Sequence, residues 1–198
     1  MPGLFFGLTH MKAFSLAIVS GNRHKFNEIK KKLEPFGIRL EWIKASLKEG
    51  KGSLEKTAIS KARQAFSIVK APVIAEDTGV FFEAFENWPG AKAKRVFEKI
   101  GFKGLLKKIE GKSRKARFET IICFTADGKK FKSFKGVFRG AICGEVHDRN
   151  KDVLPYEKIF IPAEMKKTLS SLPRSEKNKF SHRAQAAEKL GKWLEANL

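Results

Sequence analysis

The sequence predicts an α/β protein, because strands and helices alternate along its first half and a strand meander follows in the second. The apolar run at positions 16–19 is typical of a buried strand, and apolar residues three or four positions apart mark the helices. With 198 residues, 42% of them hydrophobic, the chain can bury a core. We expect one domain over residues 1–198, in which residues 1–14 are a ragged N-terminal extension.

The first half of the chain gives the order strand, helix, strand, helix, strand. Ser20-Gly21-Asn22 is a turn after the first strand, and Gly37 ends the first helix. Ser53 is the expected N-cap of the second helix, whose apolar stripe starts at Leu54. The predicted elements are strand 15–20, helix 25–36, strand 39–43, helix 53–70 and strand 73–75.

The second half is predicted to hold two short helical segments and then a meander. The helical segments cover about 94–100 and 103–109. Asp127-Gly128 is a hairpin turn between strand 117–125 and further strands over 131–146. Ser181 caps a last helix, which turns Ala187, Leu190 and Leu194 inward.

Net charge and cysteine content limit the kinds of ligand and site that the protein can be expected to have. Forty-one Lys and Arg against twenty-one Asp and Glu give a net charge of +20, which attracts polyanions such as nucleic acid, an anionic membrane or a nucleoside triphosphate. A merely lysine-rich, solvated surface is the alternative. The two cysteines lack CxxC spacing, so they suggest neither a disulfide framework nor a zinc site. The apolar run at 16–19 is too short for a signal core or a membrane span, and the cytoplasm is the expected compartment.

The segment Ser20 to Lys25 leaves a buried strand and opens a helix. Backbone N–H groups at a helix start are free donors, and the helix dipole favours an anion there. Gly21 lets the backbone approach a ligand closely, and Lys25 adds a positive charge. The segment therefore suits phosphate, although a plain strand-to-helix turn would look the same.

The segment Glu76-Asp77-Thr78-Gly79 follows the predicted strand 73–75. Carboxylates at the carboxyl ends of strands lie where ligands bind in α/β sheets. Two adjacent acids beside apolar residues cost desolvation free energy unless they are paired or bind a cation. Mg²⁺ prefers such oxygen ligands together with waters and phosphate. A turn with an Asp cap is the alternative interpretation.

A third segment, Lys177 to Arg183, combines a Ser-capped helix start with His182 and Arg183, which can bind an anion or contact a base edge. Taken alone it is equally a basic helix end. Glu49 and Lys61 flank the second helix and draw attention only beside the other segments. One basic loop, one acidic pair and a second basic element together suit a triphosphate bridged by a metal ion.

The ordered set of motifs resembles the inosine triphosphate pyrophosphatase family over about residues 15–194. The motifs are Ser-Gly-Asn-x-x-Lys at 20–25, Glu-Asp-Thr-Gly at 76–79, Pro89-Gly90 and Lys-Asn-x-x-Ser-His-Arg at 177–183. The resemblance implies an elongated two-lobed α/β fold with a twisted mixed central sheet, helices on both faces and a deep cleft between the lobes. It also implies a homodimer.

The resemblance further implies Mg²⁺-assisted attack of water at the α-phosphorus of ITP, dITP or XTP, which releases pyrophosphate. Asp77 would be the catalytic base and, with Glu49, would hold Mg²⁺; Glu76 is a third metal candidate. Protonated His182 or Arg183 would donate to the keto oxygen of the purine. The implied substrate-binding residues are Ser20, Gly21, Asn22, Lys25, Lys61, Thr78, Lys94, Tyr156, Lys177, His182 and Arg183.

Two departures from the family pattern bear on specificity. Leu154-Pro155-Tyr156-Glu157-Lys158 stands where the family carries Phe-Gly-aromatic-Asp-Pro, and Thr57 stands where it carries Asn. Relaxed or different nucleotide specificity is therefore one alternative. A basic nucleic-acid-binding protein that retains the fold is another, less favoured because sheet aromatics are usually core. A pyrophosphatase of the Maf type is the third, but its opening Ser-x-Ser-Pro-Arg-Arg pattern is absent.

Overall fold

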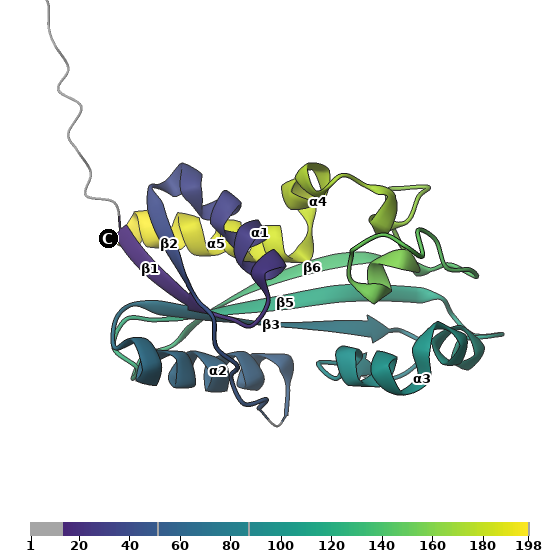
Figure 1. Cartoon of the computed structure of the whole chain (residues 1–198), viewed down its shortest axis with the longest axis horizontal. Coiled ribbons are helices and arrows are strands. Elements are labelled where there is room, and N and C mark those ends of the chain that lie inside the picture. The colour runs from purple at the N-terminus through teal and green to yellow at the C-terminus, as the bar shows by residue number, and fades with distance from the viewer. Residues whose placement is uncertain (1–13, 51, 87, 198) are drawn as a thin grey trace, which may run out of the picture.

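A mixed seven-stranded sheet forms the centre of the protein, as a computed structural model shows for residues 14–50, 52–86 and 88–197. The strand order is β2-β1-β3-β5-β6-β7, with β4 attached to β3. β1 pairs parallel with β2 and β3, whereas the remaining pairs are antiparallel. Helices cover both faces of this open sheet (Figure 1), so the predicted α/β class is confirmed.

Most predicted elements are present, with boundaries shifted by a few residues. A short helix, α4, was not predicted, and α3 unites the two predicted helical segments across a bend at Gly101. The strands are β1 (Phe14–Val19), β2 (Ile38–Ile43), β3 (Val73–Phe82), β4 (Pro89–Gly90), β5 (Lys115–Thr125), β6 (Lys132–Ile142) and β7 (Phe160–Pro162). The α-helices are α1 (Arg23–Leu33), α2 (Leu54–Val69), α3 (Ala93–Lys108), α4 (Arg174–Phe180) and α5 (His182–Asn197). Short 3-10 turns cover Glu34–Phe36, Pro155–Lys158 and Leu169–Ser171.

The prediction that the third strand ends at Ala75 is wrong, because β3 continues to Phe82. β5 pairs with β3 at every position from Val73 to Phe82, and this ladder carries the strand through its two acidic residues. The pair Glu76-Asp77 therefore lies in the middle of a buried strand rather than after its end. Tertiary pairing overrides the local preference of acidic residues for turns.

The alternation of side chains along β3 assigns its two acids to opposite faces of the sheet. Ile74 belongs to the core cluster beneath α1 and α5, whereas Ala75 packs with Ala58 and Ala62 of α2. Continuing this alternation, Glu76 faces α1 and α5, and Asp77 faces α2. In Figure 1 these two helix layers lie on either side of the sheet.

One edge of β3 is left partly open. β1 pairs with it only at positions 73 and 74, and β4 only at positions 80 and 81, so within the described residues positions 75–79 have no strand on that edge. β1 runs parallel to β3 and ends at Val19, next to this gap. The turn that starts at Ser20 therefore lies beside the acidic pair. In the described part of the chain, no helix is long and apolar enough to cross a membrane.

Candidate active site

The turn after β1 is fixed by local hydrogen bonds that orient the start of α1 toward the gap in β3. Asn22 is the N-cap, and its Oδ1 accepts hydrogen bonds from the backbone N–H groups of His24 (2.9 Å) and Lys25 (3.3 Å). The backbone N–H of Asn22 donates to Oγ of Ser20 (3.1 Å), and Trp42 Nε1 donates to the Ser20 carbonyl (2.8 Å). The result is a rigid helix N-terminus, which is a favourable place for an anion.

Glu76 is surrounded by cations on the α1/α5 side of the sheet. Its Oε2 lies 2.5 Å from Lys25 Nζ and its Oε1 lies 3.1 Å from Arg183 Nε, while the Thr78 hydroxyl also bonds Oε1. Burial disfavours the charged form, but the charges of Lys25 and Arg183 outweigh burial and hold the pKa of Glu76 well below its usual range. Glu76 is therefore a permanent carboxylate that fixes two cationic side chains.

Arg183 is a buried charge that contacts side chains of two elements, β3 and α1. Its side chain is 2% exposed, and besides Glu76 it contacts Glu28 of α1, with Nη1 2.5 Å from Oε2. Its Nη2 donates to the Thr78 hydroxyl at 3.4 Å. Burial lowers the pKa of Arg183, but Glu76 and Glu28 raise it further than that, so the guanidinium stays charged. Sequence reasoning missed Glu28; its position one helical turn after Lys25 was the available indication.

Asp77 forms a second, distinct cluster on the α2 side. Lys61 Nζ lies 2.6 Å from Asp77 Oδ1 and 3.0 Å from Glu49 Oε1. Burial raises the pKa of Asp77 to about 6 despite the opposing charge of Lys61. Asp77 Oδ2 is buried and has no hydrogen-bond partner among the described residues. One oxygen of this carboxylate is therefore available to a ligand.

The donor set around Lys61 fits a hard divalent cation that is shared with a substrate. Glu49 and Asp77 supply two carboxylates, both beside the ammonium of Lys61. Within the described ranges no group of three or more His, Cys, Asp or Glu side chains could hold a metal alone. Mg²⁺ suits such a site, because it commonly takes one or two carboxylates and completes its shell with water and phosphate. Glu76 lies on the other face with its oxygens already engaged.

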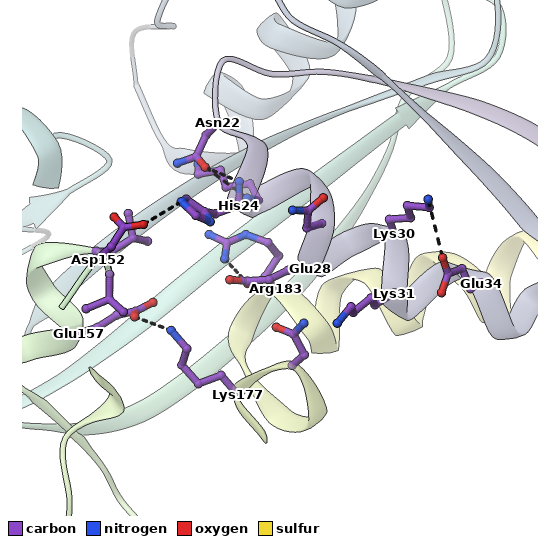
Figure 2. A pocket seen from close by; sticks show the side chains of 15 residues that line it. Asn22, His24, Glu28, Lys30, Lys31, Glu34, Asp152, Glu157, Lys177 and Arg183 are labelled. Atoms are coloured by element: carbon purple, nitrogen blue, oxygen red, sulfur yellow. Dashed lines mark hydrogen bonds and ion pairs between the residues drawn. The ribbon is translucent and has the colours of Figure 1, made fainter. Parts of the chain in front are cut away.

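A cavity of about 400 Å³ lies between α1, the segment before β7, α4 and the start of α5. Lys25, Lys177 and Arg183 line it together, as Figure 2 shows for the last two. Lys177 Nζ lies 2.6 Å from Glu157 Oε2, and both side chains are less than a tenth exposed. Burial raises the pKa of Glu157 even though Lys177 opposes the shift. Asp77 and Lys61 do not line this cavity; they lie across β3.

His182 is buried against Phe118, with ring centroids 4.9 Å apart and planes 15° from parallel. Neither ring nitrogen has a hydrogen-bond partner among the described residues. Burial and the neighbouring Arg183 hold the pKa of His182 well below its usual range. In the free protein the imidazole of His182 is therefore neutral at neutral pH, and its contact with the purine stays a prediction. A neutral imidazole still offers one N–H donor.

Two other predicted binding residues, Tyr156 and Lys94, do not line this cavity, and their roles in substrate binding stay predictions. Tyr156 is buried among Phe82 and Phe97, and its hydroxyl donates to the carbonyl of Ala93 at 3.0 Å. Its ring therefore completes the core. Lys94 is exposed on α3 and pairs with Glu98 one turn later at 3.8 Å, because its position on that helix points to solvent.

Comparison with known proteins agrees with this arrangement. Residues 16–193 match the model of the Ham1 family. The chain belongs to the Ham1 family. It is 36% identical over 187 residues to a dITP/XTP pyrophosphatase of Saccharolobus solfataricus, covering 93% of this chain and 96% of that one. It is 38% identical over 186 residues to a dITP/XTP pyrophosphatase of Hyperthermus butylicus, with the same coverage.

A solved relative shares the fold of this Ham1 protein. The HAM1 protein from Coxiella burnetii superposes with a TM-score of 0.79 at 25% sequence identity, over 92% of this chain and 99% of that one. The open mixed sheet with helices on both faces is thus a property of the family. The family resemblance predicted from the motifs is confirmed.

Proposed function

We propose that this Ham1 protein hydrolyses non-canonical purine nucleoside triphosphates, such as dITP, ITP and XTP, to the monophosphate and pyrophosphate. The observation that carries the proposal is the convergence of Lys25, Lys177 and Arg183 on one cavity that lies across a single strand from the Asp77–Lys61 pair. The activity named for the relatives from Saccharolobus solfataricus and Hyperthermus butylicus supports the same choice.

In the proposed complex the triphosphate lies along the turn after β1 and the gap in β3. The phosphates would approach the backbone of the turn at Ser20, Gly21 and Asn22, and Lys25 would add a positive charge beside them. Lys25 and Lys61 are both ion-paired in the free protein, so the phosphates compete with Glu76 and with Asp77 for these cations. Such exchange of partners costs less than leaving a buried cation unpaired.

In the proposed reaction a water oxygen attacks the α-phosphorus. The bond between the α-phosphorus and the oxygen that bridges to the β-phosphorus breaks, and pyrophosphate leaves with its electron pair. Asp77 Oδ2 accepts the proton of the attacking water, a role that suits a carboxylate whose pKa is raised to about 6. Lys61 holds the other oxygen of Asp77 and so fixes the direction of Oδ2.

Glu49 and Asp77 would hold Mg²⁺ beside the phosphates. The bound ion would stabilise charge on the phosphoryl oxygens and on the leaving pyrophosphate. This chain's own contribution is the placement of the two carboxylates around Lys61, whose ammonium lies between them.

The purine would occupy the part of the cavity lined by Glu157, Lys177 and Arg183. Hypoxanthine and xanthine present a keto oxygen at C6 and an N–H at N1. Lys177 can donate to the first and Glu157 can accept from the second, whereas adenine presents the opposite pattern and can satisfy neither group. A site built on buried hydrogen-bonding groups rejects such mismatches strongly, by a factor on the order of 10⁴.

The proposal is tested by measuring pyrophosphate release with Mg²⁺ and a panel of ITP, dITP, XTP, ATP, GTP and pyrimidine triphosphates. We expect kcat/KM for ITP and XTP to exceed that for ATP by several orders of magnitude. Equal activity across the panel would show that the altered segment 154–158 has relaxed specificity, and no release with any nucleotide would refute the enzyme. Glu157→Gln is the matched variant: it keeps the shape of the side chain but should reduce the discrimination against ATP.

We also propose that the protein forms a homodimer, and sedimentation velocity measures its oligomeric state.

A further inference from the structure

The surface of α3 and the loop after it carries a large share of the positive charge of the molecule. Residues 92–115 contain ten Lys and Arg but only two acids, Glu98 and Glu110, which gives this segment a net charge of +8 out of +20. All ten basic side chains are exposed: Lys92, Lys94, Arg95, Lys99, Lys103, Lys107, Lys108, Lys112, Arg114 and Lys115. We call this group the α3 basic face.

The cations of the α3 basic face are mostly not neutralised by the protein. Within the described ranges, Lys94 is the one member that forms an ion pair, with Glu98 at 3.8 Å. This contrasts with Lys25, Lys61, Lys177 and Arg183 at the site, each paired with a buried carboxylate. Uncompensated cations at this density raise the local concentration of a polyanion.

Two half-buried aromatic rings adjoin the α3 basic face. Phe85 and Trp88 pack edge to face with centroids 5.3 Å apart. Lys108 Nζ lies 4.9 Å from the Phe85 ring centroid and 5.1 Å from that of Trp88, and Lys112 Nζ lies 5.9 Å from Phe85. Aromatic rings and cations that bind phosphates are the two components of single-stranded nucleic acid sites.

We propose that the α3 basic face, with Phe85 and Trp88, binds single-stranded nucleic acid. A membrane surface is the weaker fit, because interfacial helices also insert apolar side chains. The apolar residues of α3, such as Leu105, are turned into the core, and the exposed large hydrophobic residue of the described chain is Ile68 on α2. α3 also lies on the opposite side of the sheet from α1, α4 and α5 (Figure 1), so the polymer would not block the nucleotide cavity.

The test measures binding of a fluorescein-labelled 20-nucleotide oligo(dT) and oligo(rU) to the full chain by fluorescence anisotropy, over a range of salt concentrations. The variant reverses four charges: Arg95→Glu, Lys99→Glu, Lys103→Glu and Lys107→Glu. The matched control makes the same change in net charge elsewhere, with Lys129→Glu, Lys130→Glu, Lys132→Glu and Lys166→Glu. All eight positions are exposed. Pyrophosphate release and the unfolding midpoint of each variant show that the fold is retained.

We expect micromolar binding by the wild type at low salt, with affinity that falls steeply as salt rises. The α3 variant should lose at least tenfold in affinity and show a shallower salt dependence, while the control variant stays within about threefold of wild type. Phe85→Leu should weaken single-stranded binding about tenfold without changing the salt slope, since one stacked base is lost.

Three results would overturn the proposal. Equal weakening by both charge-reversal sets would mean that net charge alone attracts the polymer. Tighter binding to a matched duplex than to the single strand would remove the role of the rings. Tighter binding to vesicles containing phosphatidylserine would assign the face to a membrane. None of these outcomes changes the expected rates of pyrophosphate release from the nucleotide panel. The binding proposal and the proposed enzyme activity are therefore tested independently.

Discussion

Two consecutive residues of β3, Glu76 and Asp77, have opposite electrostatic surroundings. Glu76 has both oxygens engaged, by Lys25 on one and by Arg183 and Thr78 on the other. Asp77 has one oxygen on Lys61 and the other without a partner in the described chain. Both carboxylates are buried in the same strand, so the difference arises from what each sheet face presents to them.

The comparison distinguishes a carboxylate that positions its neighbours from a carboxylate that can take part in the reaction. Two cations lower the pKa of Glu76, so its carboxylate neither takes up protons nor has oxygens left for a ligand. Burial raises the pKa of Asp77 to about 6, so this group can exchange a proton near neutral pH. A saturated carboxylate fixes its neighbours in place, while an unsaturated one can act on a bound molecule. The predictions below test this division, beginning with the largest expected effect.

Asp77→Asn should nearly abolish turnover while leaving the fold intact. The amide cannot accept the proton of the attacking water, so we expect kcat to fall on the order of 10³-fold or more with little change in KM. Steady-state release of pyrophosphate from ITP measures the effect. Asp127→Asn, in the exposed hairpin turn, is the control and should retain full activity. A fully active Asp77→Asn enzyme would remove this residue from the mechanism.

Glu76→Gln should instead mainly lower the free energy of unfolding. The substitution removes the carboxylate that pairs with both Lys25 and Arg183, so that Arg183 keeps only Glu28, and breaking a buried pair costs on the order of 3 kcal/mol. Urea unfolding measures the loss. The control is Glu119→Gln, which also sits between two cations, Arg117 and Lys135. These partners are more exposed, so this control should lose less than half as much. A larger loss of unfolding free energy for Glu119→Gln than for Glu76→Gln would contradict the structural role assigned to Glu76.

The sequence was sufficient to predict the α/β class, most elements and the segments that meet at the site. Ser20, Lys25 and Asp77 could be found because their motifs are local. The separation of Glu76 from Asp77 could not, because the strand was expected to end at Ala75 and only pairing with β5 extends it. The burial of Tyr156 and the exposure of Lys94 could not be predicted for a related reason: whether a side chain faces a cavity, the core or solvent depends on helix and loop packing.

Lys25→Met should weaken substrate binding and affect chemistry less. A charged hydrogen bond to phosphate contributes about 1.5–3 kcal/mol, so we expect a rise in KM of roughly ten- to a hundredfold with a smaller change in kcat. Initial rates with ITP measure both constants. Lys56→Met on the exposed surface of α2 removes the same charge at a distance and should behave as wild type. A change confined to kcat would place Lys25 with Asp77 rather than with the binding residues.

The smallest expected effect concerns stability as a function of pH. His182 is buried among Arg183, Lys25 and Lys177, and its folded pKa is lowered by burial and by Arg183 despite the nearby Glu76. Between that lowered pKa and the ordinary value near 6.5, the unfolded chain binds a proton that the folded chain does not. The contribution of His182 to the free energy of unfolding is therefore fully present above about pH 6.5. It decreases as the pH falls, by at most about 1.4 kcal/mol per pH unit.

The variant His182→Phe isolates this contribution, because Phe keeps an aromatic ring against Phe118 and cannot titrate. Asp77 has the opposite sign, since its raised pKa lets the folded state gain a proton below about pH 6, and it is present in both proteins. The difference in urea-unfolding free energy between wild type and His182→Phe, measured from pH 7.5 to 5, thus cancels Asp77. We expect the wild type to lose stability relative to the variant as pH falls. A difference that stays constant across this range would mean that His182 keeps its ordinary pKa in the folded protein.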